Sequence, residues 1–288
     1  MADLTDVVTT LDGRRTIVLT GAGVSTDSGI PDYRGPDSPP RSPMTIAQFR
    51  SGPDARRRYW ARSHLGWRTM TQVEPNDGHR AIADLEYSGH VFTLVTQNVD
   101  GLHRKAGSRN VVELHGRLAD VRCLDCGTGS SRRELHQRLD ELNPGFAAGA
   151  DVESAPDGDA MLEDIDGFTL ADCTVCGGVL KPDVVFFGEN VPKPRVERCF
   201  SLVDEAEAML VAGSSLTVLS GLRFVRYAHA QGMPIVIVNR GTTRADDLAT
   251  IKVDAGTTES LVELSRQLGS GVVGASRQAV PSEPSHRA

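Results

Sequence analysis

Four of the five cysteines occur as two closely spaced pairs. Cys123 and Cys126 form one C-x₂-C motif, and Cys173 and Cys176 form the other. Each motif presents two sulfurs at one turn, and two such turns suit the tetrahedral coordination of zinc. Four thiolates leave no position for water, so we expect a structural rather than a catalytic metal. Buried or redox-active thiols are the alternative. Cys199 has no neighbouring cysteine and is expected to be a small buried side chain.

A glycine-rich segment, GAGVSTDSG at residues 21–29, follows a short apolar run near the N-terminus. Glycines at the junction of a strand and a helix let backbone N–H groups approach a pyrophosphate, and the helix N-terminus adds partial positive charge. The complete G-x-G-x-x-G pattern is absent, because Thr26 occupies the place of its last glycine. By itself this loop therefore indicates nucleotide binding only weakly.

Polar side chains follow each of three predicted strands. An acid, an aromatic ring and a guanidinium come directly after the glycine loop, in IPDYRG at 30–35. TQNVDGLH at 96–103 and VVELHG at 111–116 repeat the arrangement. Burying such groups for packing alone is costly, so together they indicate a ligand crevice.

His115, at the end of the last of these strands, is the histidine that we expect to be catalytic. A neutral imidazole can act as a general base near physiological pH. The other histidines considered are expected to be structural: His64, His79, His90, His136, His229 and His286.

The elements that must position these groups alternate between strands and helices. Residues 16–20, 91–96, 208–212 and 234–238 are short apolar runs, and residues 76–87 and 220–231 have helical patterns. Apolar strands alternating with helices predict a parallel sheet covered on both faces. The predicted fold class is therefore α/β, a doubly wound parallel sheet that binds ligands at the carboxyl ends of its strands.

The middle of the chain breaks this alternation, since an insert rich in charge, glycine and proline separates the two cysteine pairs. We expect residues 1–118 and 180–268 to form one discontinuous domain, and residues 119–179 to form an inserted zinc module. Residues 36–75 are expected to add a proline-rich flexible loop and a helical segment to the small module. The polar tail, residues 269–288, is expected to be disordered.

Bulk properties exclude several classes of protein. The net charge of −7 argues against binding to nucleic acid or to anionic lipid. No apolar run approaches the ~18–20 residues that span a bilayer, and no signal peptide is apparent. We therefore expect a cytoplasmic protein with no membrane or nucleic-acid partner.

Six motifs in this order resemble the sirtuin family over about residues 10–268. They are GAGVSTDSGIPDYRG at 21–35, TQNVDGLHRKAG at 96–107, ELHG at 113–116, the paired C-x₂-C motifs, GSSL at 213–216 and IVNRG at 237–241. Four further segments resemble the class II subgroup, which includes the mitochondrial sirtuin with lipoamidase and ADP-ribosyl-transfer activities. They are CLDCG, LKPDVVFFGENV at 180–191, GSSLTVLSGLRFV at 213–225 and TTRADDLA at 242–249.

The resemblance implies a Rossmann-like NAD-binding domain with a small zinc module, and a substrate cleft between them. It implies NAD as a consumed cosubstrate and an acylated lysine, in a protein or peptide, as substrate. His115, Asn98 and Asp100 would be catalytic. The implied cofactor-binding residues are Gly21, Ala22, Gly23, Ser25, Thr26, Ile30, Pro31, Asp32, Tyr33, Arg34, Gln97, Asn98, Val99, Asp100, Gly213, Ser214, Ser215, Asn239, Arg240, Gly241 and Thr257. The motifs leave the oligomeric state open, a monomer being one option.

The chemistry that the resemblance implies is not hydride transfer. The acyl-lysine oxygen would attack C1′ of the nicotinamide ribose, expel nicotinamide and leave an alkylimidate. His115 would then take a proton from the ribose hydroxyls, and the products would be free lysine, nicotinamide and O-acyl-ADP-ribose. Ile30, Val99, Phe186 and Phe187 are expected to wall a pocket that excludes water.

Three other functions are weighed against this deacylase. Mono-ADP-ribosyl transfer to protein would use the same NAD cleavage with another acceptor. A zinc-ribbon module for nucleic acid would need a basic, aromatic-rich stripe, which the acidic chain lacks. An ordinary NAD dehydrogenase would not need the Gln97-Asn98-x-Asp100 cluster.

A last expectation concerns the acyl group. Tyr59 and Arg62 would share one face of a helix and could grip a terminal carboxylate, as a Tyr-x-x-Arg pair does in the desuccinylase branch of the family. A solvated helix face is the alternative interpretation of the same residues. The predicted substrates therefore include long or carboxylated acyl groups beside acetyl.

Overall fold

The computed structural model describes residues 4–33, 42–146, 157–158 and 165–275. Its α-helices are α1 (Thr5–Leu11), α2 (Ile46–Arg50), α3 (Pro53–Gln72), α4 (Asp77–Tyr87), α5 (Leu102–Lys105), α6 (Arg132–Leu142), α7 (Lys193–Asp204), α8 (Leu219–Ala230) and α9 (Thr257–Ala275). Its strands are β1 (Thr16–Thr20), β2 (Val91–Thr96), β3 (Val111–Glu113), β4 (Gly116–Cys123), β5 (Gly129–Ser131), β6 (Leu180–Val184), β7 (Ala208–Ala212), β8 (Ile235–Val238) and β9 (Ile251–Val253). Short 3₁₀ turns lie at Ala22–Val24, Thr26–Ser28 and Asp246–Leu248.

The larger sheet has six strands in the order β3-β2-β1-β7-β8-β9, and every neighbouring pair is parallel. The central strands β1 and β7 are buried along their whole length, as expected for a sheet covered on both faces. The predicted doubly wound fold is confirmed. Strand β8 starts one residue later than predicted, at Ile235.

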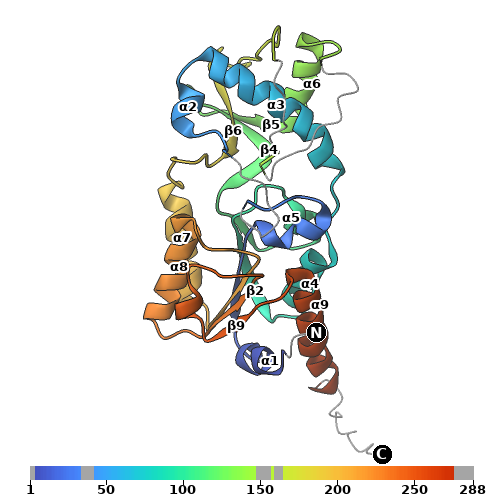
Figure 1. Ribbon diagram of the computed structural model, residues 1–288, viewed down its shortest axis with the longest axis vertical. Helices are drawn as coiled ribbons and strands as arrows, with labels where there is room; N and C mark the ends of the chain where they lie inside the picture. Colours follow the sequence, from blue (N-terminus) through green and yellow to red (C-terminus); the bar gives the residue numbers. More distant parts are fainter. Residues whose placement is uncertain (1–3, 34–41, 147–156, 159–164, 276–288) are drawn as a thin grey trace, which may run out of the picture.

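Helices cover both faces of this sheet (Figure 1). On one face, α1, α4 and α9 pack against Val18, Leu94 and Leu210. On the other face, α7 and α8 pack against Leu19 and Val211. Alternate residues of one strand thus enter opposite cores, because successive side chains point to opposite sides of a sheet.

The two helices predicted in this domain form within one residue of their expected limits. Helix α4 begins after Asn76, whose side chain accepts a hydrogen bond from the backbone of His79. The His79 ring in turn accepts one from the Asn76 backbone, which completes a capping box. His79 is fully buried at the start of α4, and its Nε2 lies 3.4 Å from the Ser25 hydroxyl.

A second, antiparallel sheet of order β5-β4-β6 forms the small module at the other end of the molecule (Figure 1). Helices α2, α3 and α6 pack on it around a separate apolar core. The indole Nε1 of Trp60 donates to the Leu180 carbonyl at 3.2 Å, and buried Arg132 donates to the Ser63 carbonyl at 3.1 Å. Helices α2 and α3, within residues 36–75, therefore pack in this module.

Three boundary predictions need revision. The predicted limit at 119 cuts through β4, and the limit at 179 leaves β6 outside the module whose sheet it completes. Helix α9 runs to Ala275 and so enters the tail that was expected to be disordered from 269. The rest of that tail and residues 36–41 of the proline-rich loop lie outside the described residues. Within the described part of the chain, no helix is both long and apolar enough to cross a membrane.

Candidate active site and zinc centre

The ends of β1 and β7 meet at the centre of the large sheet, where the strand order reverses. The Gly23 amide donates to the Gly213 carbonyl at 2.9 Å. A Cβ added at Gly21 would lie 2.8 Å from the Gly213 oxygen, so this approach requires glycine. Among the described residues, Leu216 is the single non-glycine residue with a positive φ, at 54°. The backbone of residues 21–23 can therefore lie directly against that of Gly213.

A cavity of about 570 Å³ opens over this junction and extends towards the small module. The predicted site residues that line it are Gly21, Ala22, Gly23, Ser25, Ile30, Asp32, Tyr33, Gln97, Asn98, Val99, Asp100, His115, Gly213, Ser214, Ser215, Asn239 and Arg240. Segments far apart in the sequence thus converge on one cavity of the size expected for a small-molecule site.

Four predicted cofactor residues are not among the lining residues: Thr26, Pro31, Gly241 and Thr257. Thr257 lies behind the loop and donates its hydroxyl to the Gly23 carbonyl at 2.9 Å. It supports the glycine loop rather than facing the cavity. Arg34 lies outside the described residues.

His115 lies at the start of β4, with both ring nitrogens in hydrogen bonds. Nδ1 is 2.9 Å from the Gln97 carbonyl oxygen, and Nε2 is 2.8 Å from the Ser220 hydroxyl. Burial lowers the pKa of His115 to about 4, and the charge of Arg195 acts in the same direction, while the Gln97 bond opposes both. The imidazole is therefore neutral near pH 7, which is the form that can accept a proton.

Ser25, which is 1% exposed, joins three polar side chains below the cavity. Its hydroxyl donates to Asp100 Oδ2 at 2.8 Å and accepts from Asn98 Nδ2 at 3.0 Å. His79 Nε2 lies 3.4 Å away. Because His79 Nδ1 accepts from a backbone amide, its Nε2 carries the proton and points it at Ser25. The hydroxyl thus uses its donor and both of its acceptor positions.

Asp100 is fixed by this network. Its other carboxylate oxygen accepts from the Leu102 amide at 2.9 Å, at the start of α5. Burial raises the pKa of Asp100, and the Leu102 and Ser25 hydrogen bonds counteract that rise. Gln97 is held similarly, because its Nε2 donates to Ser214 Oγ at 2.7 Å.

The far wall of the cavity comes from residues 184–191, which follow β6. Sequence reasoning named only Phe186 and Phe187 of this segment as walls. The buried Lys181 ammonium pairs with Glu189 at 2.9 Å, and Glu189 accepts from the Phe186 amide at 3.0 Å. A salt bridge inside the module thus holds the segment against the cavity. Sequence reasoning gave no role to Lys181.

Tyr59 and Arg62, both on α3, differ in their relation to the cavity. Tyr59 lines the cavity but is 6% exposed and packs edge-to-face against Phe49 and Trp60, as a core residue does. Arg62 is not among the lining residues. A carboxylate grip by this pair stays a prediction.

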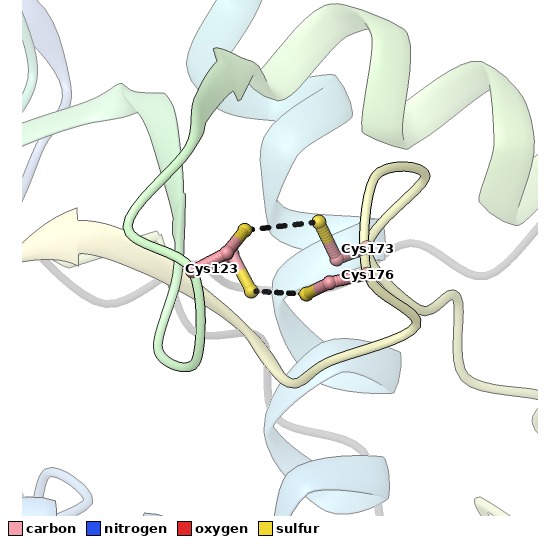
Figure 2. Close-up of side chains that lie close together, drawn as sticks. Cys123, Cys173 and Cys176 are labelled. Atoms are coloured by element: carbon pink, nitrogen blue, oxygen red, sulfur yellow. Dashed lines mark hydrogen bonds between the residues drawn. The ribbon is translucent and has the colours of Figure 1, made fainter.

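The two C-x₂-C motifs fold into matching turns that face each other (Figure 2). In each turn the fifth residue donates its amide to the carbonyl of the first cysteine, from Gly127 to Cys123 and from Gly177 to Cys173. Both glycines have a positive φ, 73° at Gly127 and 70° at Gly177. The carboxylate of Asp125 joins the turns by accepting from the Val179 amide at 2.7 Å.

All four sulfurs lie within 4.8 Å of one another, and the structure assigns the five cysteines no disulfide. Cys123 and Cys176 are separated by 3.6 Å between sulfurs, and Cys126 and Cys173 by 3.8 Å. Zinc–sulfur bonds of about 2.3 Å in a tetrahedron require sulfur separations of about 3.8 Å. The donor set and its spacing therefore fit one structural zinc, as predicted. Cys199 is fully buried elsewhere, in the core of the large domain.

A second group of possible metal ligands joins His64, His136 and Asp140 between α3 and α6. The Arg68 guanidinium already pairs with Asp140 at 3.1 Å. Burial lowers the pKa of His64 to about 3, and the charge of Arg132 contributes to that shift. Two cationic side chains at this place oppose a metal cation, so the structural interpretation of both histidines stands.

A model of the Sir2 family matches residues 21–220 of the chain. The chain belongs to the Sir2 family. It is 56% identical over 271 residues to NAD-dependent protein deacetylase 1 of Mycobacterium avium, covering 93% of this chain and 96% of the relative. It is 54% identical to the Streptomyces coelicolor enzyme of the same name, covering 93% of this chain and 90% of that one.

Solved sirtuin structures share the fold. A complex described as Sir2 with p53 peptide and NAD⁺ aligns with a TM-score of 0.74 at 32% identity, over 93% of this chain and 99% of that one. Another, described as Sir2 bound to acetylated peptide, aligns with a TM-score of 0.73 at 29% identity, over 93% and 99%. The predicted function is confirmed at the level of an NAD-dependent protein deacetylase, with NAD as cosubstrate.

Proposed function

We propose that this sirtuin removes acyl groups from lysine and consumes NAD in the reaction, and that His115 acts as the general base. The observation that carries the proposal is the position of His115 at the cavity, neutral and oriented by the Gln97 carbonyl. NAD supplies the ribose carbon to which the acyl oxygen is transferred. The neutral Nε2 of His115 accepts a proton from a ribose hydroxyl of the bound cosubstrate.

The remaining predicted residues are assigned by their place around the cavity. Gly21 and Gly23, at the end of β1, let the NAD phosphates approach the backbone and the following turn, because neither residue has a side chain. Asn98 and Asp100 orient the nicotinamide ribose, because Ser25 fixes both side chains. Ser214 and Asn239, at the ends of β7 and β8, hold the adenosine half.

The acyl-lysine enters from the side of the small module, where Phe186, Phe187 and Val99 line the cavity. These three side chains make this part of the wall apolar, and the buried ammonium of Lys181 on β6 is already paired with Glu189. A carboxylate would lose hydration against these apolar side chains. We therefore propose acetyl and other neutral acyl groups as the preferred substrates.

Two finer assignments stay proposals. The class II assignment is supported by the segments at 180–191, 213–225 and 242–249. A cytoplasmic location stays a prediction from the sequence. The described relatives are bacterial enzymes.

The deciding experiment is NAD turnover against acetyl-, butyryl- and succinyl-lysine peptides, with products read by mass spectrometry. Nicotinamide and O-acyl-ADP-ribose should appear together with free lysine, fastest for the neutral acyl groups. His115→Ala should lower the rate by roughly 10²–10⁴ because a general base is removed, while zinc content and melting temperature are retained.

Two results would count against the proposal. ADP-ribose attached to protein, in place of O-acyl-ADP-ribose, would assign the chain to mono-ADP-ribosyl transfer. A His115→Ala enzyme with most of its deacylase activity would remove His115 from the mechanism.

A further inference from the structure

Ser220, in the first turn of α8, points its hydroxyl at the ring of His115. Its Oγ lies 2.8 Å from His115 Nε2, and Ser220 also lines the cavity. The next residue is Gly221, where a Cβ would lie 2.7 Å from Gln97 Oε1. Glycine at 221 thus lets the start of α8 pack directly on the residue that orients His115. The pairing joins segments that are 105 positions apart in the sequence.

The direction of this hydrogen bond follows from the other ring nitrogen. The Gln97 carbonyl can only accept, so the proton of a neutral His115 is on Nδ1. Nε2 then has a lone pair and no hydrogen. The Ser220 hydroxyl must therefore be the donor. The charged group that acts on this ring is Arg195 of α7, which also donates to the Leu114 carbonyl at 3.2 Å.

We propose that Ser220 is a positioning residue, whose hydroxyl occupies the Nε2 lone pair of His115 until a ribose hydroxyl of NAD takes its place. This inference rests on the proposed function, in which Nε2 is the base. The Nε2 lone pair accepts one strong hydrogen bond at a time, so the Ser220 hydroxyl and the ribose hydroxyl bind to it one after the other. Ser220 is partly exposed at the cavity, which leaves its side chain space to rotate away.

The arrangement has two physical consequences. In the free enzyme the buried acceptor is satisfied, and the ring is held in the tautomer that presents an unprotonated Nε2. After Nε2 has taken a proton, the same serine oxygen can accept the new N–H, because a hydroxyl both donates and accepts. A donor to the neutral imidazole also favours the neutral form, so its removal should raise the pKa of His115.

The test compares Ser220→Ala, Ser220→Thr and Ser220→Cys with the wild-type enzyme. The first measurement is kcat/KM for NAD from about pH 4 to about pH 9, a range that reaches the pKa of His115. Loss of one donor should move the acidic limb up by about half to one pH unit in Ser220→Ala. Ser220→Thr keeps the hydroxyl and should keep the wild-type limb. Ser220→Cys, a weaker donor of similar shape, should shift the limb less than alanine and serves if the alanine variant fails to fold.

The second measurement is the ¹⁵N spectrum of histidine-labelled enzyme without NAD, with His115 identified by its absence in His115→Ala. In Ser220→Ala the Nε2 resonance should move towards that of an unbonded imidazole nitrogen, while Nδ1 keeps its proton. An unchanged Nε2 resonance and pH profile would overturn the proposal. Equal behaviour of the alanine and threonine variants would also overturn it, since the hydroxyl would then not matter. Deacylase activity retained in His115→Ala would instead refute the assignment of His115 as the general base.

Discussion

At the scale of single residues, the site depends on two histidines whose hydrogen bonds each allow only one tautomer of the neutral ring. The Gln97 carbonyl fixes the proton of His115, and a backbone amide fixes that of His79. Ser25 then acts as a junction, since its hydroxyl accepts a hydrogen bond from His79 and donates one to Asp100. Buried groups that are fully paired in this way are rigid, and rigidity is what orientation of a substrate requires.

Replacing Ser25 with alanine tests this junction. Asp100, Asn98 and His79 would each lose a partner inside the protein, and one unpaired buried group costs about 1–3 kcal/mol. Ser25→Ala should lower the unfolding midpoint and reduce kcat/KM for NAD by up to roughly 10²-fold, because the ribose site loosens. Thermal melts and steady-state kinetics give the two values. Ser88→Ala, which removes a hydroxyl bonded to the Leu85 carbonyl at the end of α4, is the matched control. Full activity in Ser25→Ala would show that the junction does not orient the site.

At the scale of elements, β4 links the chemistry to the metal. It starts beside His115 at Gly116 and ends at the zinc ligand Cys123. Gly116 has φ of 80°, and a Cβ there would lie only 1.9 Å from the Asp183 oxygen of β6. The Val185 amide also donates to the His115 carbonyl at 2.8 Å. A structural metal can therefore still support the cavity wall. The wall follows β6, and the metal holds together the far end of the sheet that contains β4 and β6.

Removal of one zinc ligand should expose this coupling. Cys173→Ser should lose the zinc, which we expect at about one per chain in the wild type. The small module should lose much of its stability, since metal-binding energy in such a site is folding energy. Metal analysis and melting curves measure both effects. Cys199→Ala, at a buried cysteine outside the cluster, should keep its zinc. Stoichiometric zinc in Cys173→Ser would contradict the ligand assignment.

At the scale of the whole molecule, burial of neutral histidines makes stability depend on pH. Burial lowers the pKa of His79 to about 4 and of His64 to about 3, and that of His103 falls well below its ordinary value. In the unfolded chain each titrates near 6.5. The unfolded state therefore binds more protons below about pH 6.5, so stability is complete above that pH and falls as the pH drops towards the folded pKa values.

His79→Gln should flatten this dependence. For a single group whose pKa falls from 6.5 to about 4, the stability lost on acidification is on the order of 3 kcal/mol. The wild-type free energy of unfolding should fall between about pH 7 and about pH 5 more steeply than that of the variant, by about 1.4 kcal/mol per pH unit at most. Urea titrations at each pH measure it, and His229→Gln, at an exposed position, is the control. Parallel slopes in wild type and His79→Gln would refute the contribution of His79.

The sequence alone determined the features that depend on local pattern. Apolar runs such as 16–20 and 208–212 predicted buried parallel strands, because only a sheet covered on both faces tolerates them. The spacing of the cysteine pairs predicted the four-sulfur cluster, since ligand geometry at one turn is set by a few residues. The convergence of Gly21, Asn98 and His115 was also predictable, because the carboxyl ends of parallel strands meet at one edge.

Only the tertiary structure decided how distant segments pair. Arg62 shares a helix with Tyr59, but which residues of α3 line the cavity depends on how the helix packs in the small module, and of the two only Tyr59 is a lining residue. The Lys181–Glu189 pair and the Ser220–His115 hydrogen bond also depend on how β6 and α8 lie against the rest of the fold. No spacing in the sequence encodes such contacts, because they follow from the three-dimensional meeting of elements that were each predicted separately.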